Sequence, residues 1–135
     1  LDVANSVHVG TRAPVDAGES IRFTRKTGYR VLPWRELAGR AASDIAEDIR
    51  SSLNGKPVYL CFDMDFFDPS VAPGVATPTP GGPNTYEGLE ILKAMQGLNI
   101  VACDINTVSP PYDVNGITAQ LAATIVLECL SLTNS

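Results

Sequence analysis

Histidine is nearly absent from this chain: among its 135 residues, His8 is the only one. A Ser-His-Asp or Cys-His nucleophile needs a suitably placed histidine, but His8 precedes every candidate nucleophile and no elbow motif is present. The glycine patterns GxGxxG and GxxxxGK are also missing, so Gly81-Gly82 does not form a phosphate-binding loop. These absences argue against a histidine-dependent nucleophilic hydrolase and against a glycine-rich phosphate loop.

Cysteines and basic residues are scarce as well. Cys61, Cys103 and Cys129 form no CxxC pair and lie in apolar segments, so we expect buried, reduced thiols. Ten basic against 15 acidic residues give a net charge of -5, which argues against a nucleic-acid partner and fits a small cationic ligand better. No apolar run approaches the roughly 20 residues that span a bilayer, and no signal pattern opens the chain. We therefore expect no membrane partner and a cytoplasmic protein.

Segments of strand and helix character alternate along the chain. An apolar composition of 44% can fill the core of one domain. The expected strands are 6–12, 29–34, 57–62 and 98–105. Helices are expected over 16–29 and 117–130. Two more helices are expected between them: one is capped by Ser43 or Asp44 and stops at Asn54-Gly55, and the other opens with an Asn84–Glu87 capping box. This order predicts a three-layer α/β/α domain with a mainly parallel sheet. The unbroken apolar strand 57–62 further predicts a sheet covered on both faces.

Two carboxylates follow that strand in the stretch CFDMDFFDPSVAPG, residues 61–74. Residues two apart in a strand project to the same face, so Asp63 and Asp65 can aim at one point, at the edge where open α/β sheets bind ligands. A hard divalent cation would neutralise this pair. The alternative is that both side chains cap amides of the following loop. The spacing alone leaves both interpretations open.

The loop that follows, residues 64–83, holds five of the ten prolines, so we expect it to be irregular but ordered, and functional. Asp68 precedes Pro69, an arrangement in which the carboxylate usually bonds the backbone of a turn. We expect a structural role for Asp68.

Several segments resemble the ureohydrolases, the arginase and agmatinase family, in order and spacing. The strongest likeness is to the family's second metal-binding signature, in which a strand ends in FDxDxxDP and is followed by APGTGTPxxGG. The matching segments here are CFDMDFFDPSVAPGVATPTPGG, SVHVGTR, NTYEGLEILKAMQGLNIVACDI and DINTVSPPYD. The resemblance identifies residues 1–135 as the carboxyl-terminal portion of a single ureohydrolase-like domain with an arginase-like fold, closest to the agmatinases.

The resemblance implies a chemistry and roles for four residues. Ureohydrolases use two divalent ions, usually manganese with nickel also possible, to activate a water that attacks a guanidinium carbon and releases urea. By position, Asp63 and Asp65 resemble two of the metal ligands, while Thr77 and Thr107 match substrate-binding positions. Thr77 can equally be an ordinary loop hydroxyl. No catalytic acid or base is identified, and the family's homotrimers or hexamers imply a homo-oligomer.

The chain departs from the family pattern in three places. The family's GGDHS-like and DxHxD-like ligand motifs are missing, and His8 is expected to be packed or hydrogen-bonded rather than to replace them. Thr107 stands where arginases and agmatinases carry a glutamate that pairs with the substrate guanidinium. Phe66 and Phe67 replace smaller residues, which either narrows the pocket or fills the core.

Three functions follow from these comparisons. The first is agmatinase-like hydrolysis of a guanidine C–N bond, for which the isolated 135 residues should be inactive. The second is hydrolysis of free guanidine on the same fold, which a neutral Thr107 favours. The third is a non-catalytic, oligomer-forming protein.

Overall fold

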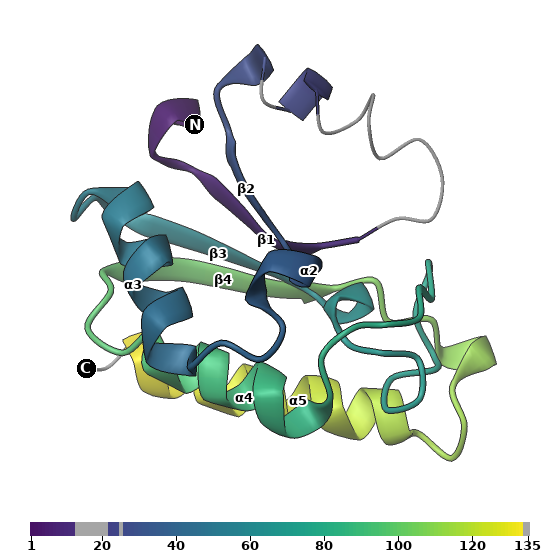
Figure 1. Cartoon of the computed structure of the whole chain (residues 1–135). Coiled ribbons are helices and arrows are strands. Elements are labelled where there is room, and N and C mark those ends of the chain that lie inside the picture. Colours follow the sequence, from purple (N-terminus) through teal and green to yellow (C-terminus); the bar gives the residue numbers. More distant parts are fainter. Residues whose placement is uncertain (13–21, 25, 134–135) are drawn as a thin grey trace.

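The computed structural model describes residues 1–12, 22–24 and 26–133 (Figure 1). The predicted alternation of strands and helices is confirmed. Half of the expected helix 16–29 lies outside the described residues, and its described positions 22–24 and 26–27 are helical. The elements are η1 (Val3–Asn5), β1 (Val7–Thr11), β2 (Arg30–Pro33), α2 (Trp34–Leu37), α3 (Ala42–Leu53), β3 (Val58–Asp63), η2 (Met64–Phe66), α4 (Thr85–Ala94), β4 (Ile100–Asn106), η3 (Pro110–Tyr112) and α5 (Ile117–Thr133).

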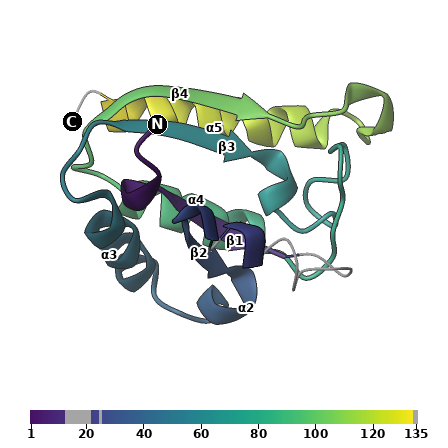
Figure 2. The same ribbon diagram turned by 90° about the horizontal axis from the view of Figure 1, so that it is seen from above.

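The strands form two parallel pairs, β1 with β2 and β3 with β4, which are separate two-stranded sheets among the described residues. Helices α4 and α5 lie along one face of the β3–β4 pair, and α5 contacts β4 directly (Figures 1 and 2). No described helix covers the other face. The parallel α/β architecture is therefore as predicted, with one helical layer on this sheet.

The expectation that residues 57–62 are buried on both faces is wrong. Burial alternates along β3, so that Phe62 is buried whereas Tyr59, Cys61 and Asp63 are exposed on the face without a helix. The apolar side chains on that face are small or carry a polar group, which the hydropathy of the run did not distinguish. Cys61 is thus an exposed thiol, contrary to the expectation for all three cysteines.

Helix α4 begins as its local sequence predicts, whereas helix α3 does not. The capping box at α4 is confirmed: the Asn84 side chain accepts from the Glu87 amide and the Glu87 carboxylate accepts from the Asn84 amide, both at 2.9 Å. Helix α3 instead begins after Ala41, which makes no side-chain cap, so the prediction of Ser43 or Asp44 as the cap is wrong. Asp44 lies in the first turn, where its charge complements the helix dipole.

The helices bury apolar stripes in a shared core. Leu121, Ile125 and Cys129 of α5 are buried as the spacing predicts, and burial raises the pKa of the Cys129 thiol to about 11. The outer side of α5 exposes Leu127 and Leu130. None of the described helices is both long enough and apolar enough to cross a membrane.

Phe66 and Phe67 pack the turn after β3 into this core. The Phe67 side chain is fully buried, and its ring centroid lies 5.5 Å from that of Phe66 and 5.8 Å from that of Phe62. Gly88 in α4 makes this contact possible, since a Cβ there would lie 2.2 Å from the Phe67 ring. Core packing is therefore the role that the structure gives Phe67.

The contact between Gly88 and Phe67 yields a stability prediction. Gly to Ala inside a helix ordinarily stabilises by about 1 kcal/mol, but overpacking against a buried ring costs about 1–3 kcal/mol. We expect Gly88→Ala to lower the free energy of unfolding in denaturant titrations. In a double-mutant cycle with Phe67→Leu, the alanine should cost less when the ring is gone; equal costs in both backgrounds would contradict the packing argument.

Candidate metal and substrate site

Asp63 and Asp65 lie at the carboxyl end of β3, as predicted, but not on one strand face. β3 ends at Asp63 and the chain turns at once into the 3-10 turn η2, whose first amides need acceptors. Asp63 Oδ1 accepts a hydrogen bond from the Asp65 amide at 2.9 Å and so caps this turn. The same-face geometry is therefore wrong, because a strand periodicity does not continue through a 3-10 turn.

Asp65 bonds the following loop. Both of its carboxylate oxygens lie 3.1 Å from the amide nitrogen of Thr77, which places that loop residue beside the turn. The two aspartates thus do cap loop amides, one of the two interpretations that the spacing left open. A carboxylate has about four lone-pair positions, and Asp63 Oδ2 accepts no hydrogen bond from the described residues. Amide capping therefore leaves acceptor capacity for a cation.

Thr107 completes the cluster from the end of β4. Its hydroxyl donates to Asp63 Oδ1 and accepts from the Asp65 amide at 3.2 Å. Its backbone φ of 64° lies in the left-handed region, which is rare for a β-branched residue. The structure therefore brings all four residues proposed from the sequence, Asp63, Asp65, Thr77 and Thr107, into one hydrogen-bonded group.

Arg12 organises this group from a distant part of the chain, and the sequence analysis gave it no role. Its guanidinium donates to the backbone carbonyls of Asp65 at 2.8 Å, Phe66 at 2.7 Å and Phe67 at 2.7 Å. It also donates to the Thr79 carbonyl, from Nε at 3.0 Å and from one terminal nitrogen at 2.8 Å. The signal available in the sequence was the arginine that ends SVHVGTR, the segment that resembles the family's IGxR strand.

His8 lies on β1, the strand that ends one residue before Arg12. It is exposed, and its ring centroid is 4.8 Å from that of Tyr29. Because His8 is exposed, the expectation of a packed histidine is not met, and its contact with Tyr29 lies at the surface.

Asp68 has the structural role that was predicted for it. Its carboxylate accepts from the amides of Ser70 at 2.9 Å, Gly81 at 2.7 Å and Gly82 at 3.2 Å. Hydrogen bonds from Ser70, first from its side chain and then from its amide, together with those from both glycines lower the pKa of Asp68 to about 2. Asp68 thus closes the long loop on itself.

The loop after β3 also docks on the loop after β4. Val75 forms an antiparallel bridge with Val108, and the Ala76 amide donates to the Thr107 carbonyl at 2.9 Å. The Gly74 amide donates to the buried hydroxyl of Thr118 at 2.9 Å, which ties the loop to α5. Residues on both sides of the PPYD turn, Thr107 and Val108 before it and Thr118 after it, therefore hold the loop after β3.

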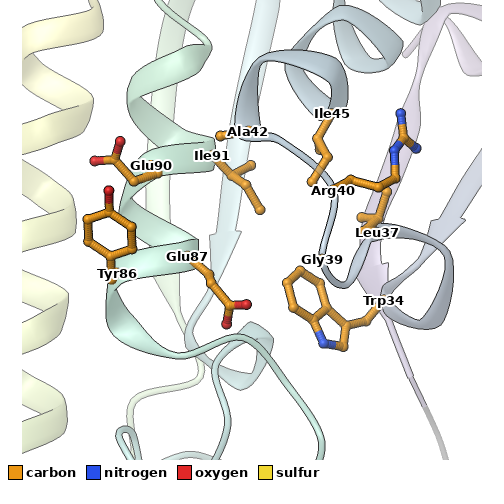
Figure 3. A pocket seen from close by; sticks show the side chains of 10 residues that line it. All are labelled: Trp34, Leu37, Gly39, Arg40, Ala42, Ile45, Tyr86, Glu87, Glu90 and Ile91. Atoms are coloured by element: carbon orange, nitrogen blue, oxygen red, sulfur yellow. The ribbon is translucent and has the colours of Figure 1, made fainter.

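The cavity in Figure 3 lies elsewhere. It holds about 120 Å³ between α2, the start of α3 and the first turns of α4. Two of its polar side chains have partners: the Glu87 carboxylate belongs to the capping box and Arg40 pairs with Asp48 at 2.8 Å. None of the four clustered residues lines this cavity, so it is not part of the candidate site. The lining residues are Trp34, Leu37, Gly39, Arg40, Ala42, Ile45, Tyr86, Glu87, Glu90 and Ile91.

The donor set of the cluster fits only part of a metal site. Carboxylate oxygens suit hard divalent ions, which take about six ligands. Asp63 and Asp65 offer two carboxylates, and the described residues contain no group of three or more His, Cys, Asp or Glu that could hold an ion. A complete coordination shell therefore needs ligands beyond those that the described residues supply.

Comparison with known proteins identifies the family to which this chain belongs. Residues 1–131 match the model of the arginase family, and the chain belongs to that family. It is 39% identical over 130 residues to a guanidinobutyrase of Pseudomonas aeruginosa, covering 96% of this chain and 41% of that protein. It is also 39% identical over 132 residues to an agmatinase of Proteus mirabilis, covering 98% of this chain and 40% of that protein.

The fold agrees with solved structures of the family. Proclavaminate amidino hydrolase from Streptomyces clavuligerus superposes with a TM-score of 0.88 at 36% identity, over 98% of this chain and 43% of that one. The fold is thus the α/β arginase fold. The chain spans about two fifths of the length of the curated relatives named above.

The lowered pKa of Asp68 predicts acid sensitivity. A carboxylate whose folded pKa of about 2 lies below the ordinary 3.8 stabilises the fold above pH 4, and this contribution is lost as the pH falls from about 4 to 2. We expect Asp68→Asn, which keeps the shape but not the charge, to be less stable at pH 7 and to show a flatter loss between pH 4 and 2. Urea titrations across this pH range measure both effects; parallel curves for the two proteins would contradict the assignment.

The four carbonyls around Arg12 predict a large effect of its removal. Hydrogen bonds to charged groups contribute about 1.5–3 kcal/mol each and are not additive, so we expect Arg12→Ala to lower the free energy of unfolding by roughly 2–4 kcal/mol. Arg12→Lys keeps the positive charge but not the planar guanidinium with its several N–H donors, so it should recover only part of the lost free energy of unfolding. Arg35, exposed on α2, offers a matched control in Arg35→Ala, expected to change stability by less than about 0.5 kcal/mol. Limited proteolysis between residues 76 and 81 should accelerate only in the Arg12 variants.

Proposed function

We propose that the protein hydrolyses the C–N bond of a guanidine compound, as an agmatinase-like ureohydrolase, with divalent metal ions held in part by Asp63 and Asp65. The observation that carries this proposal is the cluster at the carboxyl ends of β3 and β4, where both aspartates meet Thr77 and Thr107. Membership of the arginase family supports it, because relatives of this chain include a guanidinobutyrase and an agmatinase.

The chemistry of such a site is a hydrolysis. Two divalent ions, manganese first and nickel as the alternative, would lower the pKa of a water that attacks the guanidinium carbon, so that urea and an amine are released. Asp63 and Asp65 would supply carboxylate oxygens to these ions, and the turn η2 fixes where those oxygens lie. The remaining ligands and the general acid or base would come from outside the described residues.

Thr77 and Thr107 bear on the choice of substrate. Thr77 is exposed beside Asp65 and is the proposed contact for the guanidine compound. Thr107 carries no charge, so an alkylguanidinium loses a charge-assisted acceptor worth roughly 2 kcal/mol. This favours a second candidate function, the hydrolysis of free guanidine on the same fold.

Further properties proposed for the protein follow from the family resemblance. The isolated 135 residues should bind manganese weakly and turn over no substrate, because two aspartates cannot complete two coordination shells. A homotrimer or homohexamer is proposed for the full-length protein, and light scattering of the purified protein would measure it. A cytoplasmic location stays a prediction.

The experiment is an assay of urea release by the manganese- or nickel-loaded full-length protein. Agmatine, guanidinobutyrate, arginine and free guanidine are compared, and we expect turnover of at least one of them. Asp65→Ala should remove most of the activity and weaken manganese binding in calorimetry by about 10-fold or more. Arg35→Ala, which alters an exposed side chain on α2 away from this loop, serves as the control that keeps metal binding.

The outcomes separate the candidates. Preference for guanidine over agmatine would favour the second function, and no turnover with either metal would remove support for both. A full-length protein that holds no metal by elemental analysis would instead favour a non-catalytic member of the family.

A further inference from the structure

We propose that the main role of Thr107 is to position the Asp63 carboxylate rather than to donate a hydrogen bond to the substrate. The inference rests on the proposed function, since it concerns the same site, but it changes the role of this residue. Two features of Thr107 carry it: what its hydroxyl contacts, and the backbone conformation that brings the hydroxyl there.

The Thr107 hydroxyl is already committed. A threonine hydroxyl has one proton to donate and two lone pairs. Its proton goes to Asp63 Oδ1, and one lone pair accepts from the Asp65 amide at 3.2 Å. The Asn106 carbonyl, 2.8 Å from Oγ, is an alternative acceptor for the same proton. In either rotamer the proton is used within the protein, so Thr107 has no hydrogen bond to donate to a substrate, and one lone pair on Oγ has no partner among the described residues.

This geometry links the two proposed metal ligands. Asp63 Oδ1 accepts from both the Thr107 hydroxyl and the Asp65 amide, and that amide bonds Thr107 Oγ in turn. The three groups form a closed hydrogen-bonded ring, which holds Oδ1 toward the protein. The other oxygen, Oδ2, accepts no bond from the described residues and is the atom left for an ion.

The backbone at Thr107 is held in a costly conformation. A β-branched residue at φ of 64° is strained, and such strain persists only where neighbouring contacts enforce it. Here the Ala76 amide bonds the Thr107 carbonyl at 2.9 Å, and the adjoining Val75–Val108 bridge fixes the same loop pair. The loop that carries Thr77 therefore also holds Thr107 in place against Asp63.

A positioning role and a substrate contact predict opposite kinetic effects. Groups that hold a metal ligand typically change metal affinity by 10–100-fold when removed. We expect Thr107→Val, which replaces the hydroxyl by a methyl group of similar shape, to weaken manganese binding about 10-fold or more while KM at saturating manganese stays unchanged. Thr107→Ser, which keeps the hydroxyl, should restore affinity to near the wild-type value. A raised KM with unchanged manganese affinity would overturn the proposal in favour of substrate binding.

A second measurement does not require metal or turnover. In the metal-free full-length protein, exchange of the Asp65 amide hydrogen should become about fivefold faster in Thr107→Val and stay unchanged in Thr107→Ser, because one acceptor of that amide is lost. Should Thr107→Val fail to fold, Thr107→Gly removes the hydroxyl while tolerating the left-handed backbone. Unchanged exchange in the variants without a hydroxyl would overturn the proposal. A wild-type protein that releases no urea while its exchange responds as described would refute the proposed function alone.

Discussion

The candidate site depends on the guanidinium of Arg12 more than on any other group. The turn after β3 directs three successive carbonyls to the same side, and these acceptors need donors that no helix or strand provides. Arg12 satisfies them together with the carbonyl of Thr79, and so joins the start of the loop to its far end. Burial lowers the pKa of Arg12, while the charges of Asp68, Asp65 and Asp63 oppose that shift. Its cation thus also offsets an acidic turn.

The acidic residues around this cation divide into two kinds. The Asp68 carboxylate accepts hydrogen bonds from three loop amides and so stabilises the loop. Asp63 and Asp65 accept fewer bonds and retain lone pairs on the exposed side of the sheet end. Asp68 makes the loop rigid, and this rigidity fixes the direction in which the carboxylates of Asp63 and Asp65 point. An ordered loop of this type is what a preformed ligand site requires.

The packing of the sheet explains why the site looks incomplete within the described residues. The β3–β4 pair carries helices on one face, and the opposite face presents Tyr59, Cys61 and Asp104. The Tyr59 hydroxyl donates directly to Asp104, and the Asn106 side chain donates to both Cys61 and Asp104. Within the part of the chain that the structure describes, neither sheet has more than two strands. This chain covers about two fifths of the larger solved structures that share its fold.

The sequence by itself determined the parallel α/β class, the capping box of α4, the structural role of Asp68 and the membership in the arginase family. These follow from periodicity, local capping chemistry and motif order, all of which act over a few neighbouring residues. Only the tertiary structure decided how Asp63 and Asp65 are oriented, that Thr107 bonds both, and that Arg12 holds the turn. Arg12 lies more than 50 positions from the carbonyls it binds, and a contact over such a distance is fixed by packing and loop closure, which no local pattern encodes.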